Sequence, residues 1–178
     1  MLQNLILIGM PASGKSTLGK HLAELLGLSF LDTDDVLAQG LGMPLQDYIN
    51  EAGIEAFLAR EEEAVLSIEA VGTVIATGGS VVYSKAAMAH LKKTGLCIFL
   101  SVPFSAIVER LSNLETRGVA IAKGKSLREL YEERCPLYLE AADLIFREGG
   151  EEGDLSIEDH AKGLLLLLGE KSSFPPLP

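Results

Sequence analysis

The stretch GMPASGKS at residues 9–16 decides the fold. It matches the pattern G-x-x-x-x-G-K-[ST], a loop that binds nucleotide phosphates when a strand precedes it and a helix follows. The apolar run at 5–8 predicts a buried strand, and the apolar residues between 16 and 26 recur with helical spacing. Both neighbours of the loop are as the pattern requires, so the sequence predicts a site for a nucleoside triphosphate.

The residue types in this loop suit phosphate chemistry. Glycines let the backbone wrap closely around a ligand, and N–H groups at the start of the helix point at phosphate oxygens. Lys15 supplies a positive charge for the β- and γ-phosphates, and the Ser16 hydroxyl is a ligand for Mg²⁺. The residues expected to bind the triphosphate are Gly9, Ala12, Ser13, Gly14, Lys15, Ser16 and Thr17.

Outward from the loop, short apolar runs alternate with amphipathic stretches. The runs predict five strands, at 5–8, 29–31, 73–76, 96–100 and 144–146. The stretches predict helices at 16–26, 34–39, 45–50, 54–70, 84–93, 103–111, 130–142 and 156–168. This alternation predicts an α/β fold with three αβα layers and a five-stranded parallel sheet. We expect a single P-loop kinase domain over residues 1–170, with a mobile lid at about 113–128, and a disordered tail at 171–178.

Composition limits the partners of the chain. Its 178 residues carry a formal net charge of −10, so it is a poor general binder of nucleic acid or anionic membranes. Cys97 and Cys135 belong to no metal-binding or disulfide pattern. No apolar run approaches the roughly 20 residues that span a bilayer. We expect a cytoplasmic monomer that holds its anionic ligand with a local positive site.

Polar residues also follow the second and third predicted strands, at the sheet edge where such folds bind ligands. Asp32 and Asp34 come after the second strand. One carboxylate can assist Mg²⁺ and the other can accept a proton from an attacking hydroxyl, although aspartate at this turn also suits a helix N-cap. Gly78 and Gly79 follow the third strand and allow backbone N–H groups to approach a ligand.

Cations gather in the second half of the chain. Residues 116–128 contain four lysines and arginines and no acidic residue. Such a loop can close over phosphates, with Arg117 as the candidate for stabilising transition-state charge. Arg134, which follows this segment in the sequence, is a candidate for contacting the acceptor. By contrast, we expect the acidic run at 61–63 to face solvent and Phe57 to belong to the core.

The phosphate loop, Leu-Asp-Thr-Asp at 31–34, Gly78-Gly79 and Glu-Arg-x-Pro-Leu-Tyr at 133–138 together resemble the shikimate kinase family. The resemblance runs from residue 5 to about residue 146. It implies a nucleoside-monophosphate-kinase-like fold with a closing lid. It also implies transfer of the γ-phosphate of ATP to the 3-hydroxyl of shikimate, with Mg²⁺.

The resemblance implies roles for the residues on the donor side. Lys15 and its loop would hold the phosphates of ATP. Ser16 would bind the metal, and Asp32 would assist it. Arg110 would flank the adenine.

It implies a second set of roles on the acceptor side. Asp34 would bind the reacting hydroxyl and accept its proton. Gly78 and Gly79 would donate backbone hydrogen bonds to the acceptor. Arg117 would act from the lid, and Arg134 would pair with the acceptor carboxylate.

Two positions depart from the family pattern. Leu58 stands where the family has an arginine that clamps the shikimate carboxylate, and Ser80 replaces the third glycine of Gly-Gly-Gly. Arg60 is expected to face elsewhere, because two residues turn a helix by about 200°. Losing one charge-assisted contact costs about 1.5–3 kcal/mol. Two hypotheses therefore stay open: a same-fold kinase for another acceptor such as gluconate, homoserine or a nucleotide, and a non-catalytic nucleotide-binding homologue.

Overall fold

The computed structural model describes residues 4–112, 125–147 and 156–170. Its centre is one sheet made of β1 (Asn4–Ile8), β2 (Ser29–Asp32), β3 (Thr73–Ala76), β4 (Gly95–Ser101) and β5 (Leu144–Arg147). The strands lie in the order β2-β3-β1-β4-β5, and every neighbouring pair is parallel. The predicted five-stranded parallel sheet is confirmed, and each predicted strand matches its observed bounds to within about one residue at either end.

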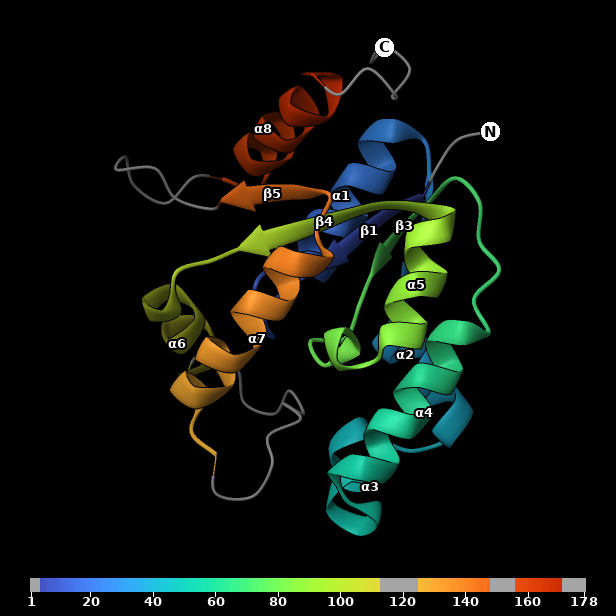
Figure 1. Cartoon of the computed structure of the whole chain (residues 1–178). Coiled ribbons are helices and arrows are strands. Elements are labelled where there is room, and N and C mark those ends of the chain that lie inside the picture. The colour runs from blue at the N-terminus through green and yellow to red at the C-terminus, as the bar shows by residue number, and fades with distance from the viewer. Residues whose placement is uncertain (1–3, 113–124, 148–155, 171–178) are drawn as a thin grey trace.

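Helices cover both faces of this sheet (Figure 1). One face carries α1 (Lys15–Leu26) and α8 (Ile157–Glu170). The other face carries α4 (Ile54–Leu66), α5 (Lys85–Thr94), α6 (Phe104–Ser112), α7 (Leu127–Ala141) and the short 3-10 helix η1 (Val81–Tyr83). The helices α2 (Thr33–Leu41) and α3 (Leu45–Ala52) pack with α4 around a small apolar cluster of their own. The three-layer αβα architecture is therefore as predicted.

Side chains alternate along β1 and supply both cores. Leu5 and Leu7 pack in the core beneath α1 and α8, whereas Ile6 and Ile8 pack in the core on the opposite face. All four side chains are fully buried. A strand covered on both faces is apolar at every position, which is why an unbroken apolar run predicted it.

The helix predicted at 54–70 ends at Leu66 instead. Ile68 has the apolar character that prolonged the helical pattern, and it is indeed buried, but in a turn where its N–H donates to Val65 O at 3.2 Å. The chain then reverses at Gly72, whose φ of 61° lies in the left-handed region, and enters β3. The sequence pattern could not separate these two cases, because Ile68 falls at helical spacing whether it reaches the core from a turn or from a longer helix.

The last long helix before β5 begins at Leu127, three residues earlier than the predicted start at 130. Ser126 and Glu129 form a capping box, in which each side chain satisfies the backbone N–H of the other residue. Residues 127–128 therefore belong to α7 rather than to the expected lid. The rest of that lid up to residue 124, and the expected tail at 171–178, lie outside the described residues.

Hydrogen bonds join the carboxyl ends of the first three strands. The N–H and the hydroxyl of Thr77 both donate to Leu7 O, at 3.1 and 3.0 Å. The Gly78 N–H donates to Thr33 Oγ1 at 2.9 Å. These bonds hold the segment after β3 against the ends of β1 and β2, where the phosphate loop and the two aspartates begin.

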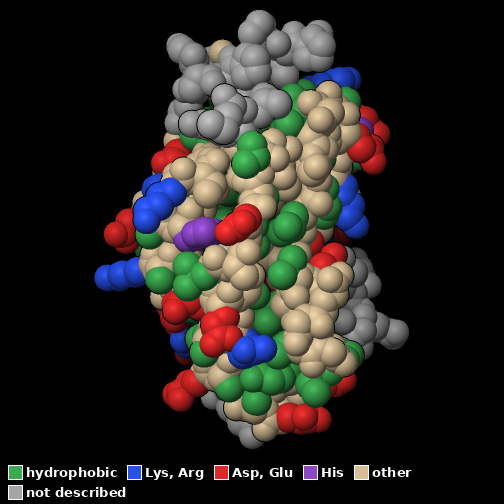
Figure 2. Space-filling view, turned by 90° about the vertical axis from the view of Figure 1, so that its right-hand side faces the viewer, with side chains coloured by type: hydrophobic (Ala, Val, Ile, Leu, Met, Phe, Trp, Pro, Cys, Tyr) green, Lys and Arg blue, Asp and Glu red, His purple; other side chains and the backbone are tan. Residues whose placement is uncertain are grey.

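The surface of the molecule carries both signs of charge. Acidic and basic side chains are interspersed on the face shown in Figure 2, with apolar groups between them. No helix in the described parts of the chain has the length and apolar character to cross a membrane.

Candidate active site

The phosphate loop links β1 to α1 in a conformation that its glycines allow. Gly9 has a φ of 151°, and a Cβ there would lie 2.9 Å from Leu100 O. Gly14 has a φ of 86°. Ala12, with a φ of 62°, is the one non-glycine among the described residues in the left-handed region, a conformation that costs about 1–3 kcal/mol. The loop is therefore held in a wrapped shape of the kind that presents N–H groups to an anion.

Lys15 is buried at the first turn of α1. Its Nζ donates to Gly9 O at 2.9 Å and to Met10 O at 2.7 Å, and it also donates to Ser13 Oγ at 3.3 Å. These bonds offset the cost of removing an ammonium group from water. They also hold a positive charge directly above the loop, where phosphate oxygens are expected.

Ser16 and Asp32 bring two oxygen ligands together. Ser16 Oγ donates to Asp32 Oδ2 at 2.6 Å, and Asp32 Oδ1 accepts a hydrogen bond from the Asp34 N–H at 3.0 Å. Asp32 is thus the N-cap of α2 as well as the partner of Ser16. No group of three or more potential metal-ligating side chains occurs in the described part of the chain. The pair fits Mg²⁺, which binds hard oxygen ligands and takes much of its coordination shell from phosphate and water.

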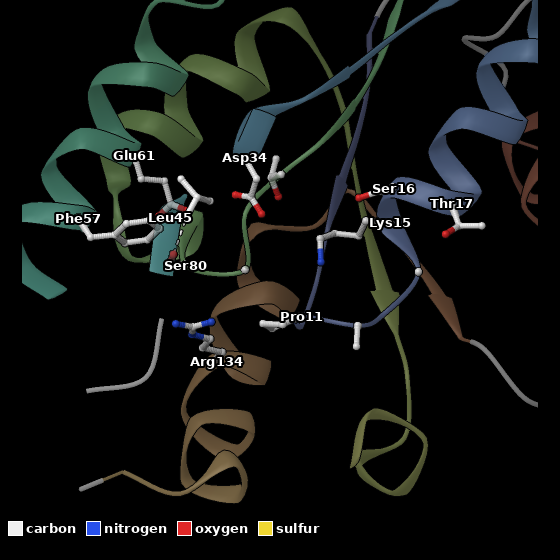
Figure 3. A pocket seen from close by; sticks show the side chains of 14 residues that line it. Pro11, Lys15, Ser16, Thr17, Asp34, Leu45, Phe57, Glu61, Ser80 and Arg134 are labelled. Atoms are coloured by element: carbon white, nitrogen blue, oxygen red, sulfur yellow. Dashed lines mark hydrogen bonds between the residues drawn. The ribbon is translucent and has the colours of Figure 1, made fainter. Parts of the chain in front are cut away.

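A cavity that is open to solvent lies beside the loop. Figure 3 shows Lys15, Asp34 and Arg134 pointing toward this space from α1, α2 and α7. The fold therefore brings two cations and a carboxylate, far apart in sequence, to one cavity. Five predicted phosphate-binding residues line it: Ala12, Gly14, Lys15, Ser16 and Thr17.

The two glycines after β3 allow close packing on the acceptor side. A Cβ on Gly78 would collide with Glu61 Oε1 and lie 2.7 Å from Asp34 Oδ1. A Cβ on Gly79 would lie 2.8 Å from Pro11 Cδ and 3.1 Å from Arg134 Nη1. The Gly78 N–H donates to Thr33 within the protein, so Gly79, which lines the cavity, is the better placed of the two to meet a ligand.

Glu61 belongs to the cavity, and the prediction that the acidic run faces solvent is wrong for this residue. It is 4% exposed and accepts a hydrogen bond from Ser80 Oγ at 2.9 Å. Its spacing from Phe57 and Val65, four residues each way, places it on the buried face of α4. That spacing was the available signal, and the neighbouring glutamates obscured it.

Burial raises the pKa of Glu61 to about 7. The Ser80 hydroxyl opposes this shift by hydrogen bonding to the carboxylate, and the nearby charge of Asp34 adds to it. Arg134 and Lys15 favour the ionised form and lower the pKa. The acceptor side of the cavity therefore contains a carboxyl group that titrates near neutral pH.

Phe57 is buried, as expected for a core residue, and it also lines the cavity. Leu58, its neighbour on α4, packs against the cluster formed by Leu37 and Phe57. Arg60 is exposed and pairs with Glu63 at 2.5 Å, so it faces away from the site as predicted. The acceptor side therefore has Leu58 at the position where the family pattern has an arginine.

Arg110 lies close to the loop and donates to Ala12 O at 3.4 Å. Gly14 also lines a second, smaller cavity, whose other walls are mainly apolar side chains, including Leu18, Leu100 and Phe146. Arg117, the expected lid arginine, lies outside the described residues.

The fold and the site define a class: the chain is an ATP-dependent phosphotransferase built on a P-loop. Residues 11–162 match the family described as shikimate kinase, and the chain belongs to that family. The resemblance inferred from the sequence is thereby confirmed.

Individual relatives extend this result. A shikimate kinase of Paracidovorax citrulli is 34% identical over 177 residues, covering 97% of this chain and 95% of the relative. Threonine synthase-like 1 of Mus musculus is 39% identical over 129 residues, which cover 71% of this chain and 17% of that longer protein. A solved structure of the shikimate kinase from Acinetobacter baumannii, in complex with shikimate, has a TM-score of 0.82, 30% identity and 96% coverage of both chains.

Proposed function

We propose that the chain transfers the γ-phosphoryl group of ATP to the 3-hydroxyl of shikimate. Family membership supports this activity. The observation that carries it is the arrangement of Lys15, Asp34 and Arg134 around one cavity. A phosphate-binding cation, a candidate base and a cation for the acceptor carboxylate together suit the phosphorylation of a hydroxy acid.

On the donor side, the loop and the N-terminus of α1 hold the phosphates of ATP. Lys15 neutralises charge that builds up on the transferred group. Ser16 and Asp32 would hold Mg²⁺, which would supply further positive charge for the phosphate oxygens. Arg110 and the apolar cavity beside Gly14 offer a place for the base of the nucleotide.

On the acceptor side, Asp34 binds the reacting hydroxyl and accepts its proton as the phosphoryl group arrives. Arg134 binds the carboxylate and holds the acceptor in the cavity. Gly79 contributes its backbone, since a side chain there would strike Pro11 and approach Arg134. Arg117 remains a prediction from the sequence.

The Asp34→Asn variant tests this proposal. The amide cannot accept a proton, so shikimate-dependent ADP release should fall about 10²- to 10⁴-fold while ATP binding persists. Asp35→Asn is the matched control, because Asp35 is exposed in the same turn of α2 and should leave turnover unchanged. Wild-type protein that binds ATP but releases no ADP with shikimate would contradict the proposal.

Leu58 favours a second candidate, a kinase of the same kind for another hydroxylated carboxylate. The family pattern has two arginines for the acceptor carboxylate. With Leu58 in place of one of them, Arg134 is the one that this chain keeps. Turnover with gluconate or homoserine, but not with shikimate, would select this candidate. In that case the donor side and Asp34 keep their roles, and only the acceptor changes.

We further propose that residues 1–170 act as one domain and that the protein works as a cytoplasmic monomer. The cysteines support a reducing compartment, because Cys97 and Cys135 are both free. Sedimentation with and without ATP would test the monomer.

A further inference from the structure

Tyr83 contacts the guanidinium of Arg134 at its Nε edge. Arg134 Nε donates to the Tyr83 hydroxyl at 3.1 Å, and its Cζ lies 5.0 Å from the centre of the Tyr83 ring. Arg134 is 1% exposed, whereas Tyr83 is half-buried at the end of η1. One side chain therefore fixes the arginine both by a hydrogen bond and by its aromatic face.

Glu133 determines which way the Tyr83 hydroxyl points. Tyr83 donates to Glu133 Oε1 at 2.8 Å, and Glu133 also pairs with Lys125. The hydrogen bonds from Lys125 and Tyr83 hold the pKa of Glu133 below its ordinary value, so this carboxylate is ionised at neutral pH and only accepts. The single hydroxyl proton of Tyr83 therefore points at Glu133, and the lone pairs of its oxygen face Arg134.

This contact also decides which edge of Arg134 meets a ligand. A guanidinium presents its N–H groups as a rigid planar fork. Because Nε is directed at Tyr83, a carboxylate in the cavity must approach the terminal nitrogens. Nη1 would lie 3.1 Å from a Cβ at Gly79, which places that end of the fork beside the cavity lining.

We propose that Tyr83, oriented by Glu133, is the positioning residue for Arg134 and thereby sets the affinity for the acceptor carboxylate. The inference rests on the proposed role of Arg134. The position of Arg134 matters more in this chain than where two arginines share the carboxylate, because Leu58 stands where the family pattern has the second arginine. The acceptor carboxylate takes no part in the bond changes, and we expect its contact to be equally strong in the ground and transition states. Such uniform binding affects KM rather than kcat.

The Tyr83→Phe variant removes the hydroxyl and keeps the ring. The KM for shikimate should rise roughly tenfold, the size expected for a lost hydrogen bond to a charged group, with kcat and the KM for ATP unchanged. Tyr131→Phe is the matched control. Tyr131 lies on α7 and donates to Val102 O at 3.0 Å, so its loss tests a missing hydroxyl that does not touch Arg134. An unchanged KM for shikimate in Tyr83→Phe overturns the inference.

A second comparison uses shikimate methyl ester, which lacks the charged carboxylate. If Tyr83 acts through Arg134, kcat/KM for the ester should be the same in wild type and Tyr83→Phe. An equal loss for ester and acid would mean that Tyr83 only supports the fold, and would overturn the inference. Wild-type protein without turnover of shikimate would instead overturn the proposed function itself, and this separates the two failures.

Discussion

The donor and acceptor sides of the cavity are assembled from very different lengths of chain. The phosphate-binding part of the donor side comes from residues 9–17, together with Asp32, which bonds to Ser16. The acceptor side draws Asp34, Glu61, Gly79 and Arg134 from α2, α4, the segment after β3 and α7. A local motif keeps its geometry wherever a strand and a helix flank it. A distributed site depends on how separate elements pack. The two departures from the family pattern that we inferred from the sequence, Leu58 and Ser80, both belong to the acceptor side.

The two sides also treat buried charge differently. Lys15 is surrounded by carbonyl oxygens of its own loop, at 2.9 and 2.7 Å. Glu61 is compensated mainly by one hydroxyl, from Ser80, and burial dominates its titration. On the donor side, the Lys15 ammonium group already has hydrogen-bond acceptors before any ligand binds. On the acceptor side, the carboxylate form of Glu61 is poorly stabilised.

The largest expected effect tests the donor side. Lys15→Ala removes the charge above the phosphate loop, and kcat should fall by about 10³-fold, as for other groups that stabilise transition-state charge. Lys20→Ala, on the exposed side of the same helix, is the control and should retain wild-type kcat. Steady-state ADP release measures both. Activity of Lys15→Ala within tenfold of wild type would mean that the loop does not hold the transferred phosphate.

The second largest effect is the pH dependence of stability that Glu61 causes, which tests how poorly the acceptor side stabilises a buried charge. The pKa of Glu61 is raised from 4.5 to about 7, so the folded protein retains a proton between these values that the unfolded chain releases. Wild-type stability should therefore fall as the pH rises from 4.5 to 7 and stay lower above it. Relative to Glu61→Gln, which cannot ionise, the loss between pH 5 and pH 8 should be on the order of 3 kcal/mol.

Urea unfolding at several pH values measures this difference. Glu63→Gln is the control on the same helix, because Glu63 is exposed and its surface pair with Arg60 adds little stability. Parallel stability curves for wild type and Glu61→Gln would show that Glu61 ionises as an ordinary surface carboxylate.

The smallest effect probes the departure from the family. Leu58→Arg restores a second cation on the acceptor side, and the KM for shikimate should fall by about tenfold if that carboxylate lies there. Ala59→Arg adds the same charge at the neighbouring exposed position and should leave KM unchanged. An unchanged KM in Leu58→Arg would place the acceptor carboxylate out of reach of α4 and strengthen the case for a different acceptor.

Much of this molecule was predictable from local patterns. Unbroken apolar runs identified all five strands, because each is covered on both faces or lies at an edge of a covered sheet. The glycine-lysine-serine motif identified the donor side. The burial of Glu61 was missed because an acidic run normally marks a solvated face. The contact of Arg134 with Tyr83 joins residues 51 positions apart, and no sequence spacing predicts such a pair.

The sheet order has a consequence for how the protein is made. β1 is central and pairs with β3 and β4, whose residues emerge from the ribosome only after about 70 to 100 more have been added. Until then, the apolar strand β1 has no neighbouring strand to pair with, and the phosphate loop that follows it is not anchored to a sheet. The nucleotide site, although encoded near the N-terminus, is thus among the later features to take shape during synthesis.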